Sequence, residues 1–350
     1  MTSFHSLKIK NIERITPNSV VVTFAVPGSH MADFRFDAGQ YLTIKKELNG
    51  QELRRAYSIC TDPGEGVLKV GIKKTPDGTF SRYANTDLKV GDVWEVHPPE
   101  GRFTFKPDAS KSRNIAAFAA GSGITPIMSI MKTVLRDEPK SRFVLIYGNK
   151  SLTETMFYDE IIELTKEYPE RLKVHFVYSR SQEPEALFGR IERSTVNFIL
   201  KNKHKERLFE AFYLCGPEEM INTVSDTLKE HGIDESAIKF ELFSTPVEEG
   251  TPEKLPEGKT QITVILDDEE TSFTMDTSKL VLDAVLEKGI DAPYSCQGGI
   301  CSSCIARITE GKAEMVKNQI LTDSEIAEGL ILTCQAHVLT DRVRIDYDDV

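Results

Sequence analysis

Short hydrophobic segments separated by turn residues fill the first hundred positions of the chain. Five of them are rich in β-branched or aromatic residues and are bounded by Gly, Pro or Asp: 20–26, 40–45, 55–59, 68–72 and 93–96. Short strands at regular spacing are typical of a β-barrel. One short helix is predicted over residues 80–85, after the loop Thr75-Pro-Asp-Gly78.

From Arg113 the hydrophobic pattern changes. A continuous apolar run at 114–120 leads through a glycine-rich turn into a helix predicted over 127–135. Further apolar strands follow at 143–147, 173–178, 211–214 and 239–243, with helical segments between them. This alternation predicts a parallel α/β sheet that binds ligands at the carboxyl ends of its strands.

The last quarter of the chain has a third pattern. Residues 244–259 lack apolar periodicity and contain three prolines and two glycines, which predicts a linker. Then come a hairpin over 261–266 and 271–275 and an amphipathic helix over 280–288 that Gly289 ends. The domains predicted are therefore 1–108 (barrel), 109–243 (α/β), the linker 244–259 and a small α+β domain, 260–350.

Composition agrees with several soluble domains. A chain of 350 residues suggests two or three domains, and 40% hydrophobic with 28% charged residues is typical of soluble globular proteins. No run reaches membrane-spanning length, and the first residues lack the apolar core of a signal peptide, so a cytoplasmic location is expected. The net charge of −11 is uneven, because residues 260–350 hold 17 acids against 7 bases. That acidity either guides a basic partner or simply maintains solubility.

Four cysteines form the strongest chemical signal. Cys296, Cys301 and Cys304 follow a C-x4-C-x2-C spacing, and Cys334 follows thirty residues later. This is the plant-type ligand set of a [2Fe-2S] cluster, and Gly298 and Gly299 suit a loop that turns tightly around it. Structural zinc, which more often has two C-x2-C pairs, disulfides and inert core cysteines are the weaker alternatives.

A second motif follows the apolar run at 114–120. Gly121, Gly123, Thr125 and Pro126 form a G-x-G-x-x-P sequence, in which glycines let the backbone approach a phosphate. Pro126 is expected at the first helical position, where no N–H is required. The two remaining cysteines, Cys60 and Cys215, are by themselves more often small core residues than reactive ones.

Two segments resemble known families. Residues 260–350 resemble plant-type ferredoxins, which implies a β-grasp fold. Arg55-Ala-Tyr-Ser58, preceded by Ala38-Gly-Gln-Tyr41, resembles the ferredoxin-NADP reductase superfamily. The resemblance implies that Arg55 pairs with a flavin pyrophosphate, that Tyr57 lies on the flavin ring, and that the Ser58 hydroxyl lies near its reactive nitrogen. Without it, the tetrapeptide is a half-buried strand with an exposed arginine pair.

The same resemblance implies further contacts. Gly78 and Ser81 begin the helix that meets the pyrophosphate, and Glu241 and Phe243 lie on the other face of the flavin, unless they simply belong to a last core strand. FAD is expected over FMN. The nucleotide contacts are Ser179, Arg180, Cys215 and Gly216, with Cys215 near the nicotinamide. The third strand ends in Ser-Arg without an adjacent acid, which favours NADPH over NADH unless Arg180 is a solvated loop charge.

The order of the domains resembles reductase components of bacterial multicomponent oxygenases. Four segments resemble the reductase subunits of phenylacetyl-CoA epoxidases: 4–7, 52–60, 80–84 and 119–126. The implied path runs from NADPH through FAD and the cluster to oxygenase components, with a di-iron oxygenase as partner and with no nucleic acid or membrane partner. Another oxygenase or a desaturase is the alternative partner, and a zinc or scaffold module is the remote alternative.

Overall fold

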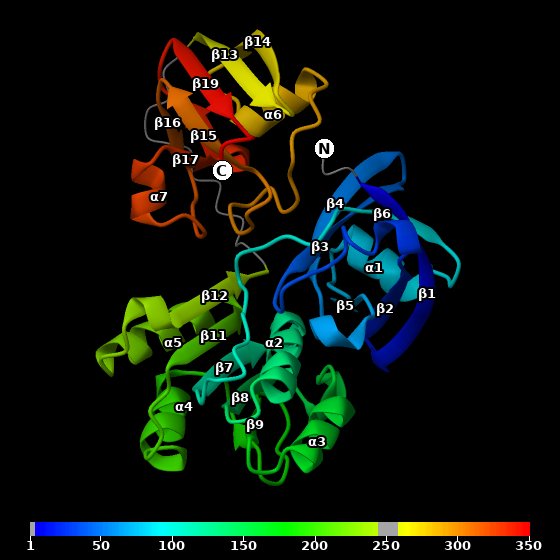
Figure 1. Ribbon diagram of the computed structural model, residues 1–350, viewed down its shortest axis with the longest axis vertical. Coiled ribbons are helices and arrows are strands. Elements are labelled where there is room, and N and C mark those ends of the chain that lie inside the picture. The colour runs from blue at the N-terminus through cyan, green and yellow to red at the C-terminus, as the bar shows by residue number, and fades with distance from the viewer. Residues whose placement is uncertain (1–3, 244–257) are drawn as a thin grey trace. The chain divides into compact units, whose positions relative to one another are not determined.

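The computed structural model describes residues 4–243 and 258–350, which form two compact units divided after Phe243 (Figure 1). Most of the predicted linker, residues 244–257, lies outside the described residues. No helix among the described residues is long and apolar enough to cross a membrane.

The first part of the larger unit is an antiparallel barrel. Its sheet has the strand order β4-β3-β6-β1-β2-β5, and a bridge between Ile59 and Val70 joins the two edge strands. Trp94 is fully buried inside, next to Phe24 and Phe80. The elements are β1 (His5–Thr16), β2 (Ser19–Ala25), β3 (Tyr41–Leu48), β4 (Gln51–Ser58), β5 (Lys69–Lys73), α1 (Thr79–Thr86) and β6 (Val93–Val96).

The barrel confirms the predicted architecture but contains one strand that the sequence patterns did not reveal. The second half of β1 alternates poorly, because it presents Asn11, Glu13 and Arg14 where apolar residues would mark a strand. Only Leu7 and Ile9, in its first half, are fully buried. The antiparallel pairing of β1 with both β2 and β6 therefore defines this strand more clearly than its composition does.

The second part of the larger unit is a parallel sheet of order β10-β9-β8-β7-β11-β12. All five strand pairs are parallel, as predicted. The strands are β7 (Asn114–Ala120), β8 (Arg142–Asn149), β9 (Leu172–Tyr178), β10 (Leu187–Phe188), β11 (Ala211–Gly216) and β12 (Ile238–Leu242). The α-helices are α2 (Ile124–Asp137), α3 (Tyr158–Glu167), α4 (Arg193–Asn197) and α5 (Glu218–Glu230).

The start of α2 corrects one expectation. The helix begins at Ile124, so Pro126 is its third residue and not its first. The first four N–H groups of a helix have no partner within it, so proline is tolerated there as well.

The barrel and the parallel sheet share one hydrophobic core. Ala38, Phe103 and Phe105 of the barrel pack in the same buried cluster as Ile127 and Tyr213 of the α/β part. Ion pairs surround this contact: Arg136 of α2 pairs with Asp62, and Lys132 pairs with Glu65. The two parts therefore hold each other in a defined arrangement.

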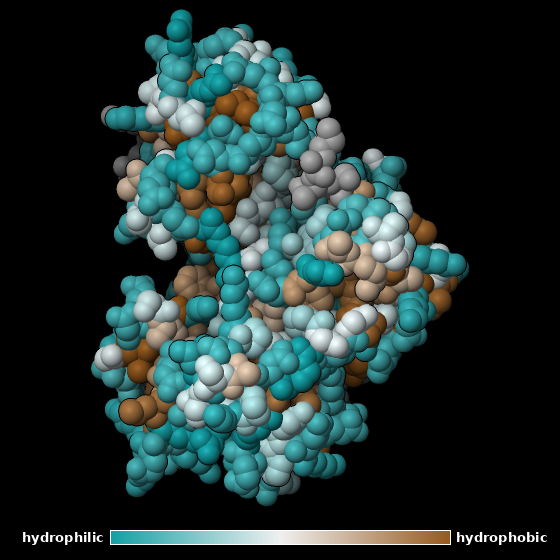
Figure 2. Space-filling view, viewed as in Figure 1, coloured by the Kyte–Doolittle hydropathy of each residue, from teal (hydrophilic) through white to brown (hydrophobic). Residues whose placement is uncertain are grey.

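The smaller unit is an α+β fold built on a five-stranded sheet of order β14-β13-β19-β15-β17. Its first hairpin and the parallel pair of first and last strands agree with the predicted β-grasp. The elements are β13 (Lys259–Leu266), β14 (Glu269–Asp276), α6 (Val281–Glu287), β15 (Ile305–Glu310), β16 (Ala313–Met315), α7 (Asp323–Ala327), β17 (Leu330–Leu332), β18 (Ala336–Val338) and β19 (Arg342–Asp346). Figure 2 shows hydrophilic residues over much of its visible face.

Candidate functional site

The four cysteines of the smaller unit converge from two segments. Cys296, Cys301 and Cys304 lie in the loop between α6 and β15, and Cys334 lies in the turn between β17 and β18. The backbone N–H and the hydroxyl of Thr333 both donate to the carbonyl of Cys304, at 3.1 and 2.9 Å. These bonds hold the distant cysteine next to the loop.

The loop has the backbone that wrapping a small cluster requires. Gln297 and Gly299 have positive φ angles of 52° and 72°. A Cβ on Gly299 would lie only 2.8 Å from the carbonyl oxygen of Lys317, so glycine is needed there. The N–H of Gly298 donates to the Cys296 sulfur at 3.3 Å, which is the kind of contact that stabilises a thiolate ligand.

The four sulfurs are spread more widely than a single zinc ion requires. Cys296 interacts with Cys301 and Cys334, and Cys304 interacts with Cys334. A single zinc ion with bonds of about 2.3 Å would hold all four sulfurs about 3.8 Å apart. Within the described residues, however, no three of these sulfurs lie within 4.8 Å of one another. Contact with Cys301 also lowers the pKa of Cys296, which favours the thiolate.

The predicted flavin residues lie along β4 and at the start of α1. Ser58 ends β4 and is buried, Tyr57 is half-buried and packs 5.6 Å from Phe80, and Arg55 is exposed. No side chain caps the start of α1, which leaves its first N–H groups free for an anion. A Cβ on Gly78 would lie 2.1 Å from the hydroxyl of Thr75, so the turn is built for a glycine.

Thr75 was missed by the sequence reasoning. Its N–H donates to the Ser81 hydroxyl at 3.2 Å, and the two hydroxyls lie 3.0 Å apart. Both side chains therefore flank the same helix start. In the sequence Thr75 lies three residues before Gly78, and this position alone does not predict its contact with Ser81.

The glycine motif lies at the carboxyl end of β7. A Cβ on Gly123 would lie 2.1 Å from the carbonyl oxygen of Cys215, and one on Gly216 would lie 2.7 Å from Met220. Thr125 is buried and donates to the carbonyl of Ser122 at 3.0 Å, and no side chain caps the start of α2. The sequence therefore folds into a bare backbone cradle, which fits a dinucleotide phosphate.

The other predicted nucleotide contacts lie at the same edge of the sheet. Ser179 follows β9 and donates from its N–H to the carbonyl of Asn149 at 3.0 Å. The N–H of Arg180 donates to Lys150 at 2.8 Å, and its side chain is exposed. These bonds align the ends of β8 and β9, so that Arg180 is presented at the edge where the cradle lies.

A lysine from the barrel reaches this cradle. The amine of Lys73, the last residue of β5, lies 3.8 Å from the position of a Cβ on Gly121. Burial lowers its pKa, and Glu154 at 3.9 Å partly offsets this. Local sequence gave no signal for Lys73, because only the packing of barrel against sheet brings it to the glycine turn.

The barrel and the α/β part of the larger unit contact each other through the side chains of Ser58 and Glu241. The Ser58 hydroxyl donates to the Glu241 carboxyl at 3.2 Å, although 183 positions separate the two residues. Cys215 on β11 is the register partner of Glu241 on β12 and is fully buried. The structure thus brings together the three residues expected at the reacting centre. Phe243 follows β12 and is 37% exposed, so its ring is not locked in the core.

Burial determines the protonation states of Glu241 and Cys215 at this junction. It raises the pKa of Glu241 to about 8, against the smaller opposing effect of the Ser58 hydrogen bond. Burial also raises the pKa of Cys215 well above its usual value, and Glu241 adds to this. Near neutral pH the carboxyl is therefore protonated and Cys215 is a neutral thiol.

The shifted pKa of Glu241 makes a testable prediction for stability. The folded protein keeps this proton up to a pH of about 8, whereas the unfolded chain loses it near 4.5. Stability therefore falls as the pH rises between these values. Between pH 6 and pH 8 the free energy of unfolding of the wild type should fall by about 2 kcal/mol for this reason. We expect Glu241→Gln not to show this fall. Melting curves of both proteins across this range would test it; parallel pH profiles would contradict it.

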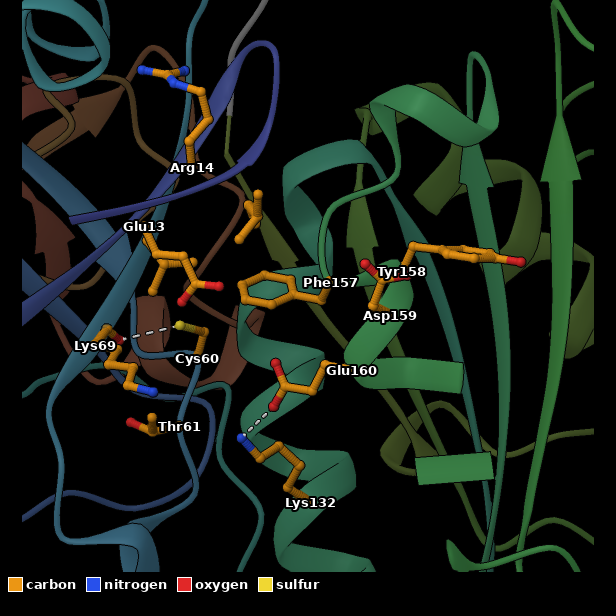
Figure 3. A pocket seen from close by; sticks show the side chains of 12 residues that line it. Glu13, Arg14, Cys60, Thr61, Lys69, Lys132, Phe157, Tyr158, Asp159 and Glu160 are labelled. Carbon is orange, nitrogen blue, oxygen red and sulfur yellow. Dashed lines mark hydrogen bonds and ion pairs between the residues drawn. The ribbon is translucent and has the colours of Figure 1, made fainter. Parts of the chain in front are cut away.

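Cys60 lies elsewhere, in the wall of a cavity of about 220 Å³ between the barrel and the α/β part (Figure 3). Its sulfur donates to the carbonyl of Lys69 at 3.4 Å, and burial raises its pKa to about 12. Across the cavity Lys132 pairs with Glu160 at 2.8 Å. Cys60 is therefore an inert core thiol, the more common alternative considered above.

Comparisons with known proteins agree with this geometry. Family models match in the order oxidoreductase FAD-binding domain (residues 6–105), oxidoreductase NAD-binding domain (118–226) and 2Fe-2S iron-sulfur cluster binding domain (264–339). The chain is similar to one of the subunits of 1,2-phenylacetyl-CoA epoxidase from Escherichia coli (strain K12), with 37% identity over 99% of both chains.

A second relative and a solved structure cover almost the same length. The ferredoxin reductase component of 3-ketosteroid-9-alpha-monooxygenase from Rhodococcus rhodochrous is 31% identical over 97% of this chain and 96% of its own. Phthalate dioxygenase reductase, solved as a modular structure for electron transfer from pyridine nucleotides to [2Fe-2S], has a similar fold. Its TM-score is 0.61 at 24% identity, over 98% of both chains.

Proposed function

The chain belongs to the family of reductases that join FAD-binding, NAD-binding and 2Fe-2S domains, and we propose that it transfers electrons from NADPH to a separate di-iron oxygenase of the phenylacetyl-CoA epoxidase type. Electron transfer from a pyridine nucleotide through FAD and a [2Fe-2S] cluster follows from the family. The choice of NADPH, the partner and the residue roles are our proposals. A cytoplasmic location is part of the same proposal.

The observation that carries the proposal is the hydrogen bond between Ser58 and Glu241. It places the end of the flavin motif against the carboxyl edge of the nucleotide-binding sheet. Bound flavin supplies the conversion between paired electrons and the single electrons that an iron-sulfur cluster carries. The protein residues at this junction bind and orient the two cofactors. They also exclude water, since Ser58, Cys215 and Glu241 are all buried.

Each cofactor has a proposed set of holding residues. Arg55, Tyr57, Ser58, Gly78, Ser81 and Phe243 would hold FAD, and Gly121, Gly123, Thr125, Pro126, Ser179, Arg180, Cys215 and Gly216 would hold the nicotinamide nucleotide. Four thiolates, Cys296, Cys301, Cys304 and Cys334, would hold the cluster. The corresponding domains are proposed as 1–108, 109–243 and 260–350, with 244–259 between the last two.

The proposed oxygenase partner rests on similarity and on charge. The relative with 37% identity over the full chain is a component of phenylacetyl-CoA epoxidase. Residues 260–350 carry 17 acids against 7 bases, which suits a basic docking surface on the partner. The similarity to 3-ketosteroid monooxygenase reductases at 31% identity makes that class of oxygenase the second candidate.

Reconstitution with purified oxygenases would test the partner. The reductase, loaded with FAD and cluster, would be mixed with phenylacetyl-CoA epoxidase oxygenase components or, separately, with a 3-ketosteroid oxygenase. We expect NADPH consumption to be coupled to product only with the epoxidase, and the coupled rate to fall as salt is raised. Equal or better coupling with the steroid oxygenase would overturn the assignment.

Arg180 provides the test for NADPH. A guanidinium–phosphate hydrogen bond contributes about 1.5–3 kcal/mol, so Arg180→Ala should raise KM for NADPH about 10- to 100-fold and leave KM for NADH nearly unchanged. Arg193→Ala is the matched control, because Arg193 is exposed and pairs with Glu230 on the same half of the unit. An equal rise in KM for NADPH and for NADH would show that Arg180 does not bind the 2′-phosphate.

A further inference from the structure

Two histidines and an aspartate converge on the barrel, and none of them is among the residues assigned to a cofactor above. The Nδ1 atom of His30 lies 3.3 Å from Oδ2 of Asp33, and the Nε2 atom of His5 lies 4.0 Å from the same oxygen. The two imidazole rings are 4.4 Å apart. Within the described part of the chain, this is the one group of three His, Cys, Asp or Glu side chains whose ligand atoms all lie within 4.8 Å of one another.

Local structure explains why the three side chains meet. His30 ends a 3-10 turn, Gly28–His30, and the N–H groups of Asp33 and Phe34 both donate to its carbonyl, at 3.1 and 3.2 Å. This single helical turn puts His30 and Asp33 on one side. Phe34 is buried at 6% exposure and fixes the turn to the barrel core.

His5 is positioned independently of that turn. It is the first residue of β1, is paired with Val96, and its ring packs edge-on against Phe34 at 5.5 Å. Its side chain is 16% exposed, against 38% for His30 and 46% for Asp33. One ligand is thus held rigidly on a strand, and the other two are accessible from solvent.

We propose that His5, His30 and Asp33 bind one divalent transition-metal ion of the zinc class. Two imidazole nitrogens and one carboxylate oxygen suit zinc, nickel or copper, whereas calcium and magnesium prefer oxygen ligands alone. Tetrahedral bonds of about 2.0–2.1 Å place neighbouring ligand atoms about 3.3 Å apart. The His30–Asp33 distance already has this value, the His5 nitrogen lies 4.0 Å from the same carboxylate oxygen, and all three ligand atoms lie within 4.8 Å of one another.

The site differs in kind from the iron-sulfur site. Its ligands are nitrogen and oxygen instead of sulfur, it lies in the other unit, and its three protein ligands leave the remaining coordination positions to water or to a side chain of another molecule. A bound ion would join the start of β1 to the 28–34 turn, and would therefore stabilise this end of the barrel.

The test uses the complete protein with FAD and cluster in place. Zinc chloride is titrated by calorimetry, and copper(II) binding is followed by EPR of the oxidised protein, with iron and flavin content measured before and after. We expect one saturable site and copper signals split by imidazole nitrogen. His30→Gln should weaken binding at least about 100-fold, since even residues behind the ligands of metal sites change affinity 10- to 100-fold.

Two further variants make the result decisive. Asp33→Asn changes a more exposed ligand and should weaken binding in the same way, which covers the case that His30→Gln fails to fold. His204→Gln is the matched control, because His204 and His175 form the other close histidine pair, with their Nε2 atoms 2.9 Å apart. No saturable binding by the wild type, equal affinity in His30→Gln and Asp33→Asn, or loss in His204→Gln alone would overturn the proposal.

Discussion

Cys334→Ala is expected to abolish electron delivery to the oxygenase while the flavin half of the protein still oxidises NADPH. A plant-type cluster needs four thiolates, and Cys334 supplies the one that comes from outside the loop. The residue is 2% exposed, and its thiol interacts with those of Cys296 and Cys304, so its removal leaves the ligand set incomplete. Iron and sulfide content should fall to the background level, and oxygenase-coupled NADPH oxidation should fall at least about 100-fold.

The measurement compares two electron acceptors. Ferricyanide, a small acceptor that takes electrons from the flavin, should be reduced at the wild-type rate, whereas the oxygenase should not. Cys60→Ala is the matched control, because Cys60 is similarly buried at 3% but belongs to the core near Lys69. If Cys334→Ala kept two iron atoms per chain, or if zinc replaced iron in the wild type, the cluster assignment would fail.

Ser58→Ala is expected to lower the rate of flavin reduction by NADPH about 100-fold without loss of bound FAD. The hydroxyl joins the barrel to Glu241 across the junction, and in the proposed function it would orient the flavin relative to the nicotinamide. Misplacement by about 1 Å at such a contact costs a factor of about 100. The effect should appear in the limiting rate at saturating NADPH, with little change in KM.

Stopped-flow bleaching of the flavin under anaerobic conditions measures this rate directly. Ser58→Thr keeps the hydroxyl and should recover much of the rate. Ser19→Ala is the control, because Ser19 is also a fully buried serine of the barrel but lies on β2. A wild-type rate in Ser58→Ala would remove Ser58 from the reacting centre.

The features that were easiest to predict from the sequence are those that a short motif encodes. The cysteine loop, the R-x-Y-S strand and the glycine turn each place their residues within about a dozen positions, so local spacing determines the geometry. The strands 93–96 and 114–120 were predicted with the observed bounds, because strong β-branched or apolar runs end at clear turn residues.

The features that the sequence could not predict depend on contacts between segments that are far apart in the chain. Ser58 meets Glu241 across 183 positions, and Lys73 reaches the Gly121 turn only because the barrel packs on the sheet. The second half of β1 carries charged residues and is identified by pairing with β2, not by its own pattern. The group of His5, His30 and Asp33 could not be predicted for the same reason, since His5 and His30 belong to separate segments.

The shared core of barrel and α/β part limits how this reductase can be recombined with others. A chimera cut near residue 108 would have to match foreign side chains to Phe103 and Phe105, which pack against Ile127 and Tyr213. A cut after Phe243 falls at the boundary between the two compact units and leaves the core of each unit whole. Engineers who wish to redirect the electrons should therefore exchange the ferredoxin module and keep both nucleotide-binding parts from a single parent.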